Sequence, residues 1–161
     1  MNSYRALKKQ VFSIGEYSIV PIRMEDRYDI MKWRNEQIYH LRQKKILTKE
    51  EQGLYFNNVV SKLFNEDQPE QILFSYLEKN KCIGYGGLVH INWVDRNAEI
   101  SFIMDTALEE SLFEFHWTTY LNLIEQVAFR ELDFHKIYTY AYDIRPQLYP
   151  ALLKQGFMED A

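Results

Sequence analysis

The 161-residue sequence has only one cysteine, Cys82, and this scarcity excludes a disulfide framework. It has no run of about 18 apolar residues that would form a membrane-spanning helix. Its first residues also lack the apolar core of a signal peptide. We therefore expect a cytoplasmic protein in a reducing compartment, without association with a membrane.

Clustered charge of one sign is also missing. The 19 Lys and Arg residues are spread along the chain among 23 Asp and Glu, which gives a formal net charge of −4. Nucleic-acid-binding surfaces carry gathered basic residues, so the sequence predicts no nucleic-acid partner. We also expect no metal site.

Aromatic residues, by contrast, are abundant, at 16% of the sequence with twelve tyrosines. This content argues against disorder and predicts a packed, partly polar interior. A chain of this length fits one domain, residues 1–161, with a sizeable core.

The chain is organised around the segment from Asn97 to Arg130. Apolar and mixed positions alternate over residues 97–105, which predicts a strand with one buried face. We expect a loop over 106–114 and then a helix over 115–130, whose apolar residues recur at helical spacing. A strand followed by a helix leaves unpaired backbone N–H groups that can hold a phosphate.

The remaining elements follow from periodicity and turn residues. We expect strands at 11–14 and 17–22, helices at 24–36 and 48–64, a hairpin of 71–77 and 82–91, a strand at 136–142 and a short helix before Gly156. Pro21 should confine its strand to an edge or a bulge. Between the first two helices, residues 38–47 form a loop that is free to lie on the substrate side.

Several of these segments resemble the Gcn5-related N-acetyltransferases (GNAT). The resembling segments are Ile72–Glu78 with Ile83–Leu88 (the central hairpin), Asn97–Phe102 (the fourth strand), Ala128–Ile137 (the entry to the fifth) and Gln155–Phe157 (the close of the last helix). The resemblance implies an α/β (α+β) fold in which a twisted, mixed, mostly antiparallel sheet is flanked by helices on both faces.

Two further segments are similar to particular subgroups of this family. Ile19–Arg23 and Met31–Glu36 resemble enzymes that acetylate N-termini of ribosomal proteins or the amino groups of nucleotide-linked amino sugars. The resemblance implies acetyl-CoA as donor, a primary amine as acceptor, and direct attack in a ternary complex. A small molecule, either an amino sugar or its nucleotide-linked form, is favoured as acceptor, and a protein N-terminus is the alternative.

The sequence also departs from the family pattern. Residues 112–117, where the family's pyrophosphate loop falls, contain no glycine, although glycine lets backbone N–H groups approach phosphate closely. Leu152 stands where the family often has a tyrosine, and Arg145 where it has an asparagine. Two readings follow besides an ordinary enzyme: a non-catalytic binding or regulatory domain, or an altered donor channel reshaped by Phe113 and Phe115.

A further departure concerns the end of the sheet. The family continues past the Gly-Phe pair with two more strands, whereas this sequence stops at Ala161. Either the sequence is truncated or a partner, such as a second copy in a homodimer, covers the open edge of the sheet.

Acetyl transfer to an amine requires a base, because an alkyl ammonium has a pKa of about 10.4. The resemblance favours Glu99 as this base, with His90 on the facing strand as the second candidate. Tyr149 or Tyr142 would protonate the departing thiolate. The structural alternatives are an ion pair between Glu99 and a neighbouring cation, and ordinary packing for the histidine and the tyrosines.

The remaining site residues divide into an acceptor side and a donor side. We expect the acceptor to meet Trp33, Arg34 and Asn35, since a guanidinium beside an aromatic ring can clamp a diphosphate or stack on a base. The alternative is a polar helix end with Trp33 in the core. The donor side is predicted to comprise Phe102, Ile103, Met104, Ser111, Phe113, Thr118 and Arg145.

Overall fold

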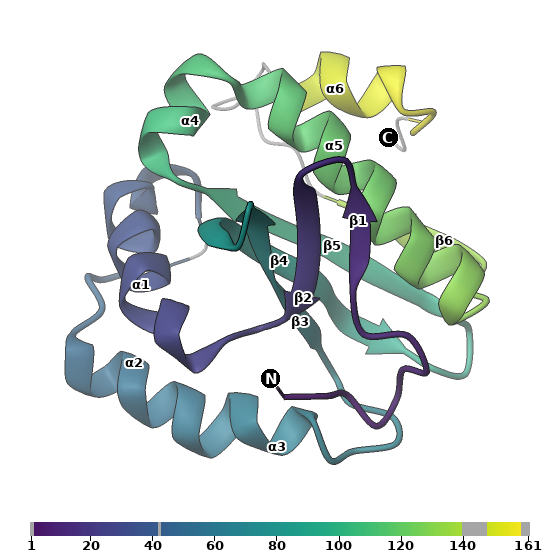
Figure 1. Cartoon of the computed structure of the whole chain (residues 1–161), viewed down its shortest axis with the longest axis horizontal. Coiled ribbons are helices and arrows are strands. Elements are labelled where there is room, and N and C mark those ends of the chain that lie inside the picture. The colour runs from purple at the N-terminus through teal and green to yellow at the C-terminus, as the bar shows by residue number, and fades with distance from the viewer. Residues whose placement is uncertain (1, 42, 140–147, 159–161) are drawn as a thin grey trace.

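The computed structural model describes residues 2–41, 43–139 and 148–158. In these residues the strands form a six-stranded sheet with the order β1-β2-β3-β4-β5-β6 (Figure 1). The strands are β1 (Phe12–Ile14), β2 (Tyr17–Pro21), β3 (Ile72–Glu78), β4 (Lys81–Asn92), β5 (Asn97–Met104) and β6 (Lys136–Tyr138). Neighbours from β1 to β5 are antiparallel, and β6 joins β5 in parallel.

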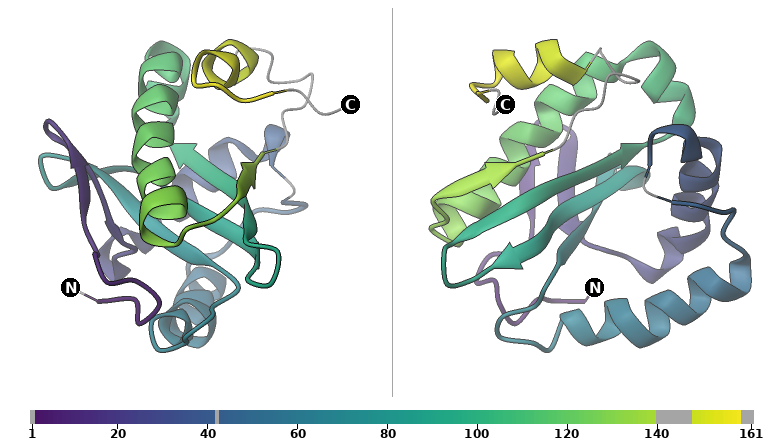
Figure 2. Two further views of the ribbon diagram at one scale, coloured as in Figure 1. Left: turned by 90° about the vertical axis from the view of Figure 1, so that its right-hand side faces the viewer. Right: turned by 180° about the vertical axis from the view of Figure 1, so that it is seen from behind.

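The helices lie on both sides of this sheet. They are α1 (Arg27–Glu36), α2 (Lys49–Tyr55), α3 (Ser61–Leu63), α4 (Thr106–Ser111), α5 (Phe113–Glu125) and α6 (Leu148–Lys154). Short 3-10 turns cover Met24–Asp26 and Ile38–His40, and π-helical turns cover Phe56–Val60 and Gln126–Glu131. Figure 2 shows α5 and α6 against one face and α1 to α3 on the other. The predicted mixed sheet with helices on both faces is confirmed.

The predicted apolar stripe of α5 forms the core on its side of the sheet. Trp117, Leu121, Ile124 and Ala128 are all buried. Phe102 of β5 stacks on Tyr120 with ring centroids 4.0 Å apart. The apolar face of β5 therefore meets α5, and the other face is left for the helices across the sheet.

Close packing explains the glycines of β4. A Cβ at Gly86 would lie 2.0 Å from the carbonyl oxygen of Ser101 and 2.7 Å from the Tyr120 hydroxyl. Here the close neighbours are the backbone of β5 and a side chain of α5. Gly86 thus allows β4, β5 and α5 to pack closely together.

Helix boundaries follow local capping. The predicted start of the second helix is confirmed, because Thr48 and Glu51 form a capping box at α2. The prediction of a loop over 106–114 is wrong: this segment contains α4, whose N-cap Asp105 accepts a hydrogen bond from the backbone N–H of Ala107. Helix α5 accordingly begins at Phe113, two residues earlier than predicted.

Two strand predictions also change. β2 has partners on both sides, so it is not an edge strand, but β1 pairs only as far as Ile19. Pro21 therefore has no partner residue on β1, so its lack of a backbone N–H removes no hydrogen bond between these two strands. The predicted strand at 136–142 is observed as β6 over Lys136–Tyr138, and its last residues lie outside the described part of the chain.

Candidate active site

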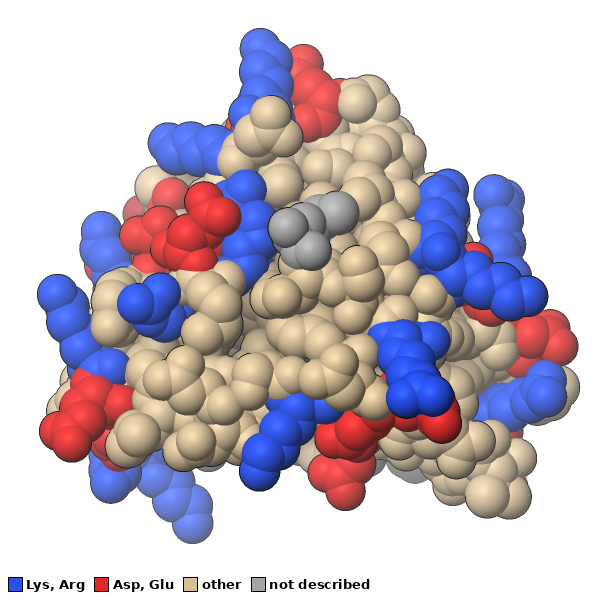
Figure 3. Space-filling model, turned by 60° about the horizontal axis from the view of Figure 1, so that its bottom comes forward, with Lys and Arg blue, Asp and Glu red and all other residues tan. Residues whose placement is uncertain are grey.

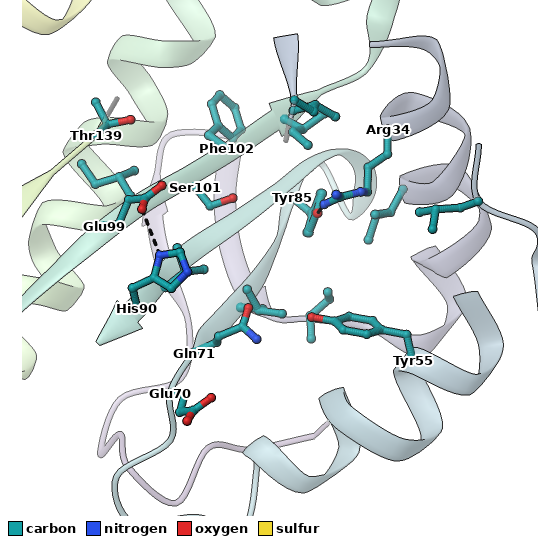
Figure 4. A pocket seen from close by; sticks show the side chains of 18 of the residues that line it. Arg34, Tyr55, Glu70, Gln71, Tyr85, His90, Glu99, Ser101, Phe102 and Thr139 are labelled. Carbon is teal, nitrogen blue, oxygen red and sulfur yellow. Dashed lines mark hydrogen bonds and ion pairs between the residues drawn. The ribbon is translucent and has the colours of Figure 1, made fainter. Parts of the chain in front are cut away.

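A groove of about 960 Å³ lies between the helices α1 and α2 and the strands β3 to β5 (Figure 4). This volume is in the usual range of small-molecule sites. Polar side chains from six elements or their flanking segments line it, together with apolar side chains. The polar lining comprises Arg34, His40, Glu51, Gln52, Tyr55, Glu70, Gln71, Tyr85, His90, Glu99, Ser101 and Thr139.

One end of the groove is cationic and aromatic. Arg34 extends from α1 toward Tyr85 of β4, and its Nη1 donates to the Tyr85 hydroxyl at 2.6 Å. Its Nε donates to the side-chain oxygen of Gln43 at 3.0 Å. The nearby Tyr85 oxygen raises the pKa of Arg34, and burial opposes this rise. Within the described ranges, both hydrogen-bond partners of this half-buried guanidinium are neutral groups.

Tyr55 of α2 lies at the same end of the groove (Figure 4). Partial burial raises the pKa of its phenol, and a hydrogen bond with Gln71 acts in the opposite direction. The phenol therefore stays protonated at neutral pH. Together with Tyr85 it offers an aromatic surface and hydroxyl groups beside the charge of Arg34.

The other end of the groove holds a carboxylate and an imidazole. Glu99 of β5 and His90 of β4 are joined by a bond of 2.9 Å between Glu99 Oε1 and His90 Nδ1. The Glu99 side chain is 13% exposed and the His90 side chain is 63% exposed. The structure thus brings together the two residues that the sequence suggested separately as bases.

Between these ends the groove follows the edge of β5. The parallel pairing with β6 ends at Glu99 and Tyr138, so the edge of β5 beyond Glu99 has no partner among the described residues of β6. The groove passes this edge, because its lining includes Phe102 and Trp117 on the α5 side.

The backbone of β5 shows which N–H groups face this open edge. The N–H of Asp105 donates to the carbonyl of Ile83 in β4, and backbone groups alternate in direction along a strand. The N–H of Ile103 therefore also faces β4, whereas those of Phe102 and Met104 face the opening. Gln37, at the end of α1, donates to the Met104 carbonyl at 2.7 Å and fixes this edge to the helix.

The segment that lacks glycine forms the joint between α4 and α5. The N–H of His116 donates to the Leu112 carbonyl, and the helix has no side-chain cap. The N–H groups of the first turn of α5 consequently have no intrahelical acceptor. Phe113 is buried against Trp117, and Phe115 faces Tyr17 on the β2 side. Neither phenylalanine lines the groove.

Of the three predicted acceptor residues, only Arg34 lines the groove. Trp33 is buried in the core. Asn35 bonds both backbone groups of Leu47, and it also accepts a hydrogen bond from Gln43. It thereby holds the loop that follows α1.

The predicted donor residues are spread along β5, α4 and α5. Phe102 and Ile103 line the groove, and Met104 is buried at the end of β5. Ser111 donates to Ala107 within α4, and Thr118 lies on α5. Tyr149 lies in α6, although its side chain is outside the described part, as are Tyr142 and Arg145 altogether. Roles for these residues remain predictions.

Sequence reasoning missed Tyr85 and Ser101. The available signal was strand alternation: Tyr85 pairs with Ile103, which shares a strand face with Glu99 and Ser101. Tyr85 stands between Gly84 and Gly86, and glycines within a strand indicate close backbone packing rather than a side-chain site. Tyr55 was assigned to the apolar face of its helix, although it is 39% exposed at the groove.

Other ligand classes find no support in the described residues. No group of three or more His, Cys, Asp or Glu there is arranged to hold a metal ion. Within the same residues, no helix has the length and apolar character needed to cross a bilayer. On the face shown in Figure 3, Lys and Arg alternate with Asp and Glu around the rim, without a basic patch.

A groove lined by ionisable side chains beside an opening in a mixed sheet defines a small-molecule enzyme site on an α/β fold. The family model described as "Acetyltransferase (GNAT) domain" matches residues 19–143, which is more than three quarters of the chain. The chain belongs to the GNAT family of acetyltransferases. It is an N-acetyltransferase, and its donor is acetyl-CoA.

Solved structures share this fold. A spermidine N-acetyltransferase from Vibrio cholerae in complex with CoA and spermine matches with a TM-score of 0.74 and 19% identity, over 92% of this chain and 84% of that chain. A dodecameric structure of spermidine N-acetyltransferase from Vibrio cholerae matches with a TM-score of 0.72 and 21% identity, over 92% of this chain and 82% of that chain. A probable acetyltransferase matches with a TM-score of 0.72 and 16% identity, over 94% of this chain and 84% of that chain. Comparison with curated protein sequences gave no significant match.

Proposed function

We propose that this acetyltransferase acetylates the primary amine of a small molecule that also carries an anionic group, with a nucleotide-linked amino sugar as the favoured acceptor. The observation that carries the proposal is Arg34. Its charge faces the groove, and its hydrogen-bond partners in the described chain are the hydroxyl of Tyr85 and the amide of Gln43. A half-buried cation with neutral partners is well suited to bind an anion.

The surroundings of Arg34 fit a nucleotide better than a simple carboxylate. A guanidinium binds phosphate oxygens through paired N–H donors, and it also stacks on planar rings. Tyr55 and Tyr85 supply aromatic surface at the same end of the groove (Figure 4). A sugar nucleotide offers both features, a diphosphate and a planar base.

The amine of such an acceptor belongs at the opposite end, beside Glu99 and His90. These side chains are ionisable, lie next to the open edge of β5, and are separated from Arg34 along the groove (Figure 4). An acceptor bound with its anion at Arg34 thereby directs its amine toward the strand edge where the acetyl group must lie. Arg34 acts in binding and orientation.

The described residues fit acetyl-CoA along β5 and α5. The outward N–H groups of Phe102 and Met104 can bond an extended pantetheine chain, and one of them can stabilise charge that develops on the thioester oxygen. The N–H groups of Glu114 and Phe115, in the first turn of α5, have no intrahelical acceptor and suit the pyrophosphate without any glycine. When bound, acetyl-CoA supplies an acetyl group activated as a thioester.

A second acceptor class is a polyamine or a peptide N-terminus. Glu51, Glu70 and Glu99 line the groove and would attract a cation. Glu51, however, already caps α2 and lies 3.6 Å from Lys45. We rank this class second, because Arg34 would repel a polycation from its end of the groove.

An acceptor panel tests the proposal. The purified chain is incubated with acetyl-CoA and, separately, a UDP-linked amino sugar, the free amino sugar, spermidine and a short peptide, and release of free CoA is measured. We expect the highest kcat/KM for the UDP-linked amino sugar. Arg34→Ala should raise the KM for the UDP-linked amino sugar by about 10- to 100-fold, because it removes one charge-assisted contact. The KM for acetyl-CoA should change little.

Arg27→Ala is the matched control, because Arg27 lies on the same helix but bonds the Met24 carbonyl and stacks over Tyr28 away from the groove. It should leave both KM values unchanged. Preference for spermidine or the peptide would overturn the acceptor assignment. If acetyl-CoA at millimolar concentration also fails to raise the thermal midpoint, the chain is a non-catalytic binding domain.

A further inference from the structure

The pairing of His90 with Glu99 depends on an irregularity in the sheet. Val89 lies opposite Glu99 across the β4–β5 ladder, so both side chains face the groove. Strict alternation would turn the next residue, His90, to the other face. Instead the register shifts between Val89 and Asn92, and His90 adopts a φ of 48°, in the left-handed region. Two consecutive residues of β4 therefore line the same groove.

A left-handed backbone is unfavourable for a residue with a Cβ, and such conformations concentrate at functional sites. Here the unusual backbone has an identifiable result, because it brings His90 Nδ1 to 2.9 Å from Glu99 Oε1. A β-bulge often re-aims a side chain beside an active site in this way. The geometry thus holds the imidazole against the carboxylate.

Hydrogen-bond chemistry then assigns the two ring nitrogens. A carboxylate only accepts, so a neutral imidazole bonded to it must carry its proton on Nδ1. This leaves the lone pair on Nε2. In Figure 4 the ring lies below Glu99 with its second nitrogen directed toward the middle of the groove. The basic nitrogen of the pair therefore faces the place proposed for the acceptor.

We infer that His90 is the base that deprotonates the acceptor amine and that Glu99 is the residue that positions it. This inference rests on the proposed function, and it reverses the order expected from the sequence. Nε2 of His90 accepts a proton from the ammonium form of the acceptor, and the Glu99 carboxylate stabilises the resulting imidazolium until it passes this proton to solvent. The neutral amine nitrogen attacks the thioester carbon. As the C–N bond forms, the C–S bond breaks, and the second proton of the nitrogen passes through Nε2 of His90 to the departing thiolate.

Burial suits these two roles. The Glu99 side chain, at 13% exposure, is largely enclosed, whereas that of His90, at 63%, can exchange its proton with water. Titratable groups flank the pair on two neighbouring elements. Glu70, whose backbone carbonyl accepts a hydrogen bond from the N–H of Ile91, lines the groove, and Tyr138 and Lys136 lie on β6 opposite Glu99 and Asn97. Lys136 is a basic residue but lies opposite Asn97 rather than Glu99, and the Glu99 carboxylate, 2.9 Å from the ring, favours formation of the imidazolium.

The test measures kcat, KM and the pH–rate profile of His90→Ala, His90→Asn and Glu99→Gln with whichever primary amine the unaltered chain acetylates best. Asparagine tolerates positive φ and so preserves the bulge. A general base contributes about 100- to 10,000-fold, so both His90 variants should lose kcat in this range with little change in KM. Added imidazole should restore part of the activity of His90→Ala. Glu99→Gln should lower kcat but retain an acidic limb in the profile.

The control is His135→Ala, which removes another exposed imidazole. The hydrogen bond of His135 to the Arg96 carbonyl comes from its backbone N–H and is kept in this variant. This variant should keep the activity of the unaltered chain, and added imidazole should not change that activity. If the His90 variants keep full kcat and the acidic limb while Glu99→Gln loses both, Glu99 is the base and the inference is wrong. Activity of the unaltered chain reports on the proposed function separately, because the inference concerns only the ratios between variants.

Discussion

The two faces of the central sheet use the same residue types for different purposes. On the α5 face, Tyr120 is fully buried, stacks on Phe102 and donates to the Ser101 carbonyl at 2.7 Å. On the groove face, Tyr85 and Tyr55 lie beside a charged guanidinium in an open cavity. The phenol of Tyr120 joins α5 to β5 inside the protein, whereas the phenols of Tyr55 and Tyr85 remain accessible to a ligand in the groove.

The histidines show the same division. His116 is buried on the α5 face, where its Nδ1 and the Tyr76 hydroxyl lie 2.9 Å apart. His90 is exposed on the groove face and is aimed by a strained backbone. Residue type alone therefore does not distinguish a structural from a functional side chain. The face of the strand and the accessibility of the second ring nitrogen do.

The largest expected contrast is between two Tyr→Ala substitutions. Tyr120→Ala leaves a large cavity and an unpaired carbonyl, so it should lower the free energy of unfolding by about 3–5 kcal/mol in urea denaturation. Tyr55→Ala, at a site that is 39% exposed, should cost less than about 1 kcal/mol and instead raise the acceptor KM. Equal losses of stability would remove the distinction between the faces.

A glycine pair gives the next contrast. Gly86→Ala forces a methyl group against the Ser101 carbonyl and the Tyr120 hydroxyl, and should destabilise the fold by about 1–3 kcal/mol. Gly53→Ala, inside α2 with nothing within 4 Å of the new methyl, should stabilise it by about 0.5–1 kcal/mol. Thermal midpoints that move in the same direction for both variants would contradict the assignment of Gly86 to a packed joint.

The smallest effect concerns pH. Burial lowers the pKa of His116, with Glu78 acting weakly in the opposite direction. Below an ordinary histidine pKa of about 6.5 the unfolded chain therefore binds more protons than the folded chain. The free energy of unfolding should fall as the pH falls from 6.5, by at most about 1.4 kcal/mol per pH unit from this residue.

Urea denaturation at pH 7.5, 6.5 and 5.5 measures this dependence. His116→Gln should flatten it, whereas Tyr76→Phe, which keeps the buried imidazole, should retain it. A slope that survives in His116→Gln would show that the pH dependence arises elsewhere.

Much of the fold could be predicted from the sequence. The strand around Ile100, the stripe of α5 and the capping box at Thr48 are local patterns with a direct physical cause. Helix α4 was missed, because a short helix leaves little periodicity and its Asp105 cap also suits a turn. The order of the paired strands follows from the family pattern rather than from alternation.

The site was predictable only in part. Arg34, Glu99 and His90 were identified by their chemistry, and each lines the groove. Their arrangement was not, because the contact between His90 and Glu99 requires a register shift that violates the period of two on which strand predictions rest. Tyr85 was missed although its position follows the alternation of the strand, because the glycines on either side of it indicate backbone packing rather than a side-chain site.

The hydrogen bonds of Gln37 have a mechanical consequence. Its fully buried amide joins the end of α1 to the Met104 carbonyl and to Thr106 at the start of α4. The helix that carries Arg34 therefore cannot slide along β5 without breaking these bonds. The length of one glutamine side chain sets the spacing between the wall that holds Arg34 and the strand edge where the sheet opens.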